Sequence, residues 1–144
     1  MRKLSDKIKK DAMAMNACPE IVDNWSRMGM VEKYHEGAKW CMEREFPSYE
    51  VMAKFDKEAV AYGIYNQKTA SLIAEKEQYV FNGSKIDLVV DSYKVCRVFI
   101  GRGTELNITV KDNAVAIVSN YGGTVNKTIA DKGRCIIWDK ELEI

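Results

Sequence analysis

The chain has 144 residues, of which 47% are hydrophobic and 30% are charged, a composition typical of one globular domain or two small halves sharing a core. Its 22 basic and 21 acidic residues give a net charge of +1, which disfavours nucleic acid as the main partner. Apolar runs are far shorter than the roughly 20 residues of a membrane span, so we expect no membrane insertion. The basic N-terminus has no apolar segment behind it, so we expect no signal peptide and a cytoplasmic location.

Residues 1–77 are predicted to form a helical region. A stripe at helical spacing defines the first helix, and its members are Leu4, Ile8, Ala12 and Met15. Pro19 suits the start of a second short helix, and a longer helix is expected over residues 30–46. Ser48 is expected to cap the next helix, and Gly63 to end the last one. Residues 66–77 are charge-rich and are predicted to be a further helix or an irregular linker.

Residues 78–144 are predicted to form a region of repeated β-strands. Apolar residues at i, i+2 and i+4 recur about every ten residues, which indicates one supersecondary unit used repeatedly. The copies are Ile86/Leu88/Val90, Cys96/Val98/Ile100, Leu106/Ile108/Val110 and, more weakly, Val115/Ile117, Val125/Ile129 and Cys135/Ile137. We therefore predict an α+β protein in which the helical region caps one end of a parallel β-solenoid of about three coils. The spacing also allows an antiparallel β-sandwich. The two regions are expected to form one compact unit.

A resemblance to a known family supports this division. The segment from Tyr34 to Tyr65 and the repeat-like segment 112–118 resemble small proteins of phages and mobile elements of gut Bacteroidota. The motifs that carry the resemblance are Cys41, Glu45-Phe46-Pro47-Ser48, Phe55, Tyr62-Gly63-Ile64-Tyr65 and Asp112-Asn113-Ala114-Val115-Ala116-Ile117-Val118. In that family a helical N-terminal part precedes a short repeat-built β part. The resemblance implies a phage or mobile-element context and the cytoplasm of a bacterial host, and it supplies no catalytic residues.

Catalytic and metal-binding motifs are absent from the sequence. The four cysteines are widely spaced and His35 is the only histidine, so a structural zinc site is disfavoured. Cys96 and Cys135 occupy buried positions of their triplets and are expected to be reduced core residues. Asp87 and Asp91 are typical of a solvated strand face. We therefore expect no catalytic residue, no metal and no cofactor, and we expect that the protein is not an enzyme.

The candidate binding residues are arginines and tyrosines near the predicted turns or on the outer faces of strands. They are Tyr93, Arg97, Arg102, Tyr121 and Arg134, which suit a host protein or a small anionic ligand. Ile136 and Trp138 have the opposite parity from Cys135 and Ile137, so the last strand is apolar on both faces and a dimer or trimer is expected.

Two functions follow as expectations. The first is a non-enzymatic binding protein of a phage or mobile element that blocks or sequesters a host defence component or a signalling ligand. The alternative is a homo-oligomeric structural or assembly protein of a phage particle.

Overall fold

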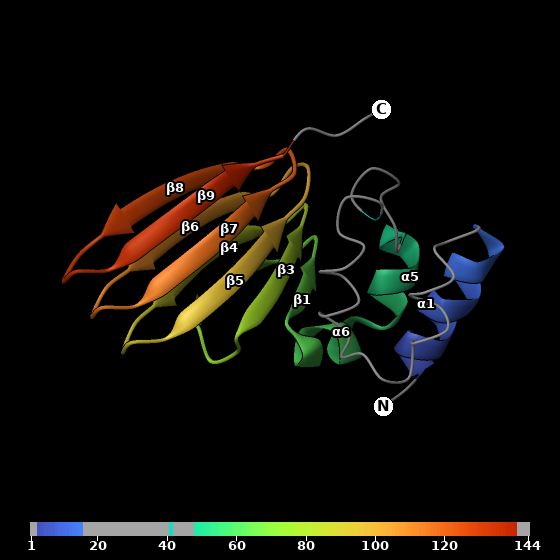
Figure 1. The fold of residues 1–144 in the computed structure, drawn as a ribbon. Coiled ribbons are helices and arrows are strands. Elements are labelled where there is room, and N and C mark those ends of the chain that lie inside the picture. Colours follow the sequence, from blue (N-terminus) through green and yellow to red (C-terminus); the bar gives the residue numbers. More distant parts are fainter. Residues whose placement is uncertain (1–2, 16–40, 42–47, 141–144) are drawn as a thin grey trace.

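The structure is a computed structural model that describes residues 3–15, 41 and 48–140. In these ranges three helices, α1 (Lys3–Ala14), α5 (Tyr49–Lys54) and α6 (Asp56–Tyr62), precede nine strands (Figure 1). The strands are β1 (Ile64–Asn66), β2 (Thr69–Ile73), β3 (Gln78–Asn82), β4 (Lys85–Val90), β5 (Val95–Ile100), β6 (Glu105–Val110), β7 (Val115–Asn120), β8 (Thr124–Ile129) and β9 (Arg134–Asp139).

The strands form a two-sheet parallel β-solenoid. Odd-numbered strands make sheet A, in the order β1-β3-β5-β7-β9, and even-numbered strands make sheet B, in the order β2-β4-β6-β8. Every pairing within the two sheets is parallel, so the predicted solenoid is confirmed and the antiparallel sandwich is wrong. The solenoid has about four turns, one more than the apolar triplets predicted.

The additional turn lies in residues that were predicted to be helix or linker. Strand β1 begins at Ile64, so the β region starts well before residue 78. On β2, Ala70 and Leu72 lie in register with Ile86 and Leu88 of β4 and face the same interior. The first coil is four residues shorter than the coil that joins β5 to β7. Ala70 and Leu72 alone make a weak strand pattern, and the charged residues on both sides of β2 favoured the interpretation as a helix or linker.

The inward face of β7 was also predicted wrongly. The register places Ala116 opposite Cys96 and Val118 opposite Val98, and all four side chains face the interior. Val115 and Ile117, which the sequence pattern placed in the core, therefore face outward. Four consecutive apolar residues carry no period of two, so the local sequence does not indicate which pair is buried.

The interior core lies between the two sheets. Its largest fully buried members are Phe81, Ile86, Leu88, Val98, Ile100, Leu106 and Ile108. Tyr65, Tyr79 and Phe81 pack together near the first coil, with centroid distances of 5.6 Å from Phe81 to each tyrosine ring. Burial raises the pKa of Cys96 to about 12, so this thiol stays protonated as expected for a core cysteine.

A second core joins the helices to the outer face of sheet A. It contains Ile8, Ala12, Met52 and Ala59 from the helices and Ile64, Val80, Phe99 and Tyr121 from the solenoid side. Figure 1 shows α1, α5 and α6 at the β1 end of the stack, as the predicted helical cap requires. Among the described helices, none is long and apolar enough to cross a lipid bilayer.

The described helix ends follow the predicted sequence signals. The backbone N–H of Val51 donates to the Ser48 hydroxyl at 3.3 Å, and Gly63 ends α6 with a left-handed φ of +90°. The helices predicted after Pro19 and over residues 30–46 lie outside the described residues, apart from Cys41.

Candidate binding face

In-register parallel pairing places outward side chains of sheet A in three columns. Neighbouring strands are about 4.8 Å apart, so members of one column are in contact range. On β5, β7 and β9 of sheet A, the columns are Val95–Val115–Arg134, Arg97–Ile117–Ile136 and Phe99–Ser119–Trp138. Six of these nine side chains are apolar and face outward, an unusual composition for the outer face of a sheet.

The helical layer covers only part of this surface. Phe99 is 3% exposed because it packs in the second core, whereas Trp138 at the end of the same column is 50% exposed. Val95 and Ile136 are 59% and 38% exposed. We define the open face by seven residues, of which four are exposed (Val95, Arg134, Ile136 and Trp138) and three are half-buried (Arg97, Val115 and Ile117). Contiguous exposed apolar surface of this kind marks an interaction site.

The seven residues that define the open face include two arginines and no acidic residue. Arg97 and Arg134 lie in adjacent columns, two strands apart, among the apolar side chains. The Lys140 ammonium adds a further cation, since its Nζ lies 5.1 Å from the centre of the Trp138 ring. Guanidinium and ammonium groups beside an aromatic and aliphatic surface favour an acidic partner that also buries apolar area.

The outer face of sheet B is different in kind. Its central column is a hydrogen-bonded polar ladder in which Asn107 Nδ2 donates to Asp87 Oδ1 at 2.9 Å and Asn126 Nδ2 donates to Asn107 Oδ1 at 3.0 Å. Most of its other outward residues are threonines or charged residues. The apolar exceptions are the neighbouring pair Ile73 and Val89, of which Ile73 is exposed. The two outer faces are therefore distinct, and the solvated one belongs to sheet B.

The structure brings together four of the seven residues predicted to bind a partner or form an interface. Arg97, Arg134, Ile136 and Trp138 all lie on the open face. As predicted, Ile136 and Trp138 face away from Cys135 and Ile137, which lie on the interior side.

Two other predicted residues lie elsewhere, in the turns that follow β5 and β7. Tyr121 is 7% exposed and packs in the second core, so its ring is not a surface contact. Arg102 is half-buried and its stem lies against Gly122, where an added Cβ would come 3.1 Å from Arg102 Cγ. Neither residue is part of the open face.

Tyr93 lies in the turn that leads into β5, two residues before Val95. Its φ is +62°, and its counterparts in the two later turns, Asn113 and Lys132, have φ of +60°. The preceding residue in each turn also has a positive φ, which is the pattern of a type I′ turn. Asparagine tolerates this conformation, whereas a tyrosine that is 75% exposed does so at a cost in backbone energy.

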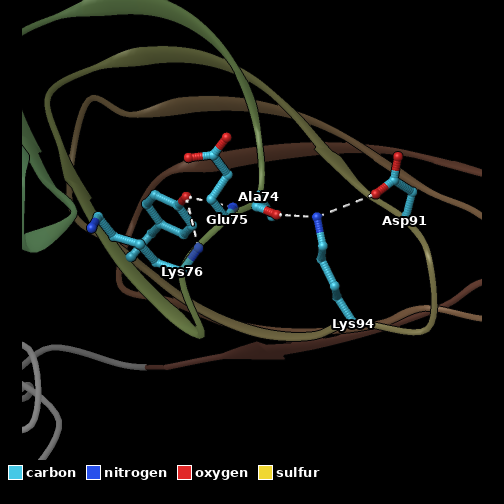
Figure 2. A network of polar contacts seen from close by, with 6 residues as sticks. Ala74, Glu75, Lys76, Asp91 and Lys94 are labelled. Carbon is cyan, nitrogen blue, oxygen red and sulfur yellow. Dashed lines mark hydrogen bonds and ion pairs between the residues drawn. The ribbon is translucent and has the colours of Figure 1, made fainter.

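The same turn is tied to the first coil by its lysine. Lys94 Nζ donates to the carbonyl oxygen of Ala74 at 2.8 Å and lies 3.5 Å from Asp91 Oδ1 (Figure 2). The Tyr79 hydroxyl accepts the backbone N–H groups of Glu75 and Lys76 at 3.1 and 3.3 Å. These contacts hold the irregular arc 74–77 against the turn before β5 and fix the edge of the open face.

Replacing Tyr93 tests whether its ring is retained at the expense of stability. Tyr93→Asn is expected to raise the free energy of unfolding by about 0.5–1 kcal/mol, because asparagine is favoured where φ is positive. Urea denaturation measures the change, and Tyr93→Phe, which has the same backbone preference, is expected to leave stability unaltered. A loss of stability in Tyr93→Asn would show instead that the ring contributes a stabilising contact.

Sequence reasoning missed the apolar centre of the open face. Val115 and Ile117 were assigned to the core, and Val95 was left unassigned. The signal that remained was the apolar run 115–118, which requires burial on both sides of its strand. Among the residues that the structure describes, no three histidine, cysteine, aspartate or glutamate side chains gather in a way that could hold a metal ion.

The fold and the face define a helix-capped parallel β-solenoid with one apolar, cationic outer surface. Comparisons with protein-family models, with curated proteins and with solved structures find no match to this chain.

Proposed function

We propose that this chain is a non-enzymatic binding protein whose open face docks a partner protein with apolar side chains flanked by carboxylates. The observation that carries the proposal is the column Phe99–Ser119–Trp138, which is buried under the helical layer at one end and half exposed at Trp138. An apolar surface that is only partly covered by its own chain favours a partner for the remainder. In the phage or mobile-element context, that partner is a host factor, such as a defence component, which the bound protein blocks.

The alternative is a homo-oligomeric assembly protein that buries the same face between copies. Ile136 and Trp138 favour it, because both are large, apolar and exposed on the last strand. However, pairing two open faces brings the Arg134 guanidinium groups of both copies to one interface. Like charges brought together in this way oppose association, so a complementary acidic partner fits better.

A retention experiment with matched variants tests the proposal. The purified wild-type chain, the pair Ile136→Ser/Trp138→Ser and the sheet B control Thr109→Ser/Thr128→Ser are immobilised and exposed to a lysate of a gut Bacteroidota bacterium. We expect a protein to be retained by the wild type and the control and at least tenfold less by the open-face variant. Retention should also fall as salt increases, since the arginines contribute to it.

Other outcomes contradict the proposal in identifiable ways. Equal retention by all three chains would show that the open face is not the docking surface. Retention of a nucleotide, with no protein, would favour sequestration of an anionic ligand. Light scattering that gives a dimer or trimer mass for the wild type and a monomer mass for Ile136→Ser/Trp138→Ser would favour the assembly protein.

A further inference from the structure

In the part of the chain that the structure describes, β8 and β9 are the last strands of their sheets, and no further strand pairs with them on the side away from the stack. The N–H groups of Thr124 and Ala130 donate back to Thr104 and Val110 on the preceding coil. Alternate residues of a parallel strand point their backbone groups to opposite sides, so Val125, Lys127 and Ile129 present theirs outward from the stack. Such an edge is a template for pairing with another strand.

One interior column changes character at this end. The register aligns Leu72, Leu88, Ile108 and Lys127, and the first three are apolar residues that face the space between the sheets. The residues on either side of Lys127 in the same interior row are Val125 and Ile129, which continue apolar columns. Lys127 is therefore a charged residue at a position that every earlier coil fills with a hydrocarbon.

The electrostatics of the neighbouring thiol agree with this placement. Burial raises the pKa of Cys135, and the positive charge of Lys127 partly opposes that rise. Cys135 is an inward residue of β9, in register with Ala116 of β7. The register gives both residues inward positions on the last coil, Lys127 on β8 and Cys135 on β9.

We propose that the inward ammonium group of Lys127 prevents another strand pair, such as the end of a second copy, from stacking on β8 and β9. On the open end the ammonium group is exposed to water and carries little cost. A second copy stacked end to end would seal it between two coils. The inward residues of β9 are Cys135, Ile137 and, at the end of the strand, Asp139, whose carboxylate already accepts Asn120 Nδ2 at 3.0 Å. Cys135 and Ile137 supply no negative partner to an enclosed ammonium group.

Symmetry strengthens the argument against self-pairing. Two copies joined at these ends by a two-fold axis place β8 against either β8 or β9 of the other copy. The first arrangement adds a second inward lysine to the same interior, and the second places the ammonium over Cys135 and Ile137, the apolar inward residues of β9. Inward-pointing charge on an edge strand is a known means of preventing edge-to-edge association.

The test replaces Lys127 with leucine, so that the inward column becomes apolar on all four strands of sheet B. Lys127→Leu is expected to form end-to-end dimers or larger species at tens of micromolar, seen as at least a doubling of mass relative to the wild type by light scattering. Amide hydrogen exchange at Val125, residue 127 and Ile129 should slow at least tenfold as concentration rises. Lys127→Arg and the turn variant Lys132→Leu, which adds the same side chain outside the interior, should retain the wild-type mass and exchange rates.

A second variant distinguishes loss of the inward charge from non-specific association caused by a more hydrophobic surface. Adding Ile137→Lys to Lys127→Leu returns a charge to the interior of the last coil from the other sheet, and it should restore the wild-type mass. The proposal is overturned if Lys127→Leu keeps the wild-type mass and exchange rates, or if Lys132→Leu associates equally. It is also overturned if the wild type itself shows concentration-dependent protection at the three edge amides.

Discussion

Val98→Asp is expected to abolish cooperative folding. Val98 is fully buried between the sheets, in register with Tyr79 on β3 and Val118 on β7. A carboxylate there loses its hydration and finds apolar neighbours, at a cost of about 4 kcal/mol or more. Since a domain of this size is stable by only about 5–15 kcal/mol, most of the stability is lost. Circular dichroism during heating should show no sharp transition, or one shifted down by more than about 10 °C.

Val95→Asp is the matched control for this substitution. It makes the same chemical change on the same strand, but Val95 is 59% exposed on the open face. A surface site of this kind should lose no more than about 1 kcal/mol. If the two variants melt at the same temperature, Val98 is not part of a packed interior and the register described for β5 is wrong.

Gly133→Ala is expected to destabilise the last coil, although it adds only one methyl group. A Cβ at this position would lie 2.2 Å from the carbonyl oxygen of Val110 and 2.4 Å from its carbon. That oxygen accepts the backbone N–H of Ala130 at 3.0 Å, so the clash falls on a hydrogen-bonded part of the stack. The turn between β8 and β9 must move away from β6, at a cost of about 3 kcal/mol. Urea denaturation monitored by circular dichroism measures the loss.

Gly103→Ala separates the clash from the backbone preference of glycine. Gly103 has a φ of +75°, but the nearest atom to an added Cβ is Gly83 Cα at 3.8 Å. The cost there is the left-handed conformation alone, about 1 kcal/mol. Equal losses in the two alanine variants would mean that the Gly133 turn has room to shift, and that the last coil is less tightly stacked than its contacts indicate.

The repeated strands were predictable because their signal is local. A period of two buries one face of a strand, and a constant spacing between turns lets equal units stack. Even so, β1 and β2 were hidden, since the short first coil contributes only Ala70 and Leu72 to the interior from β2. The helix cap at Ser48 and the helix end at Gly63 were predictable for the same reason, because a cap acts within one turn of its own chain.

The candidate site was predictable only in part. Arg97, Ile136 and Trp138 were identified from parity and Arg134 from its place before the last apolar triplet, and the register places all four on one surface. Tyr121 looked equivalent in sequence but is buried, because the helices pack over its end of sheet A. No local pattern reports which outward side chains another segment covers.

By itself, the sequence determined the alternation of strand and turn behind a helical segment, a pattern that favoured a parallel stack but also allowed an antiparallel sandwich. Those features depend on neighbours within a few residues, where periodicity and turn chemistry operate. The tertiary structure alone decided which face of β7 is buried, where the helical layer stops and what surrounds Lys127. The face of β7 and the surroundings of Lys127 depend on alignment between residues about 20 positions apart, and the extent of the helical layer depends on contacts between segments still farther apart in the chain. The register places Val115 and Ile117 of the apolar run on the open face, and it places Lys127 at an inward position of the last coil.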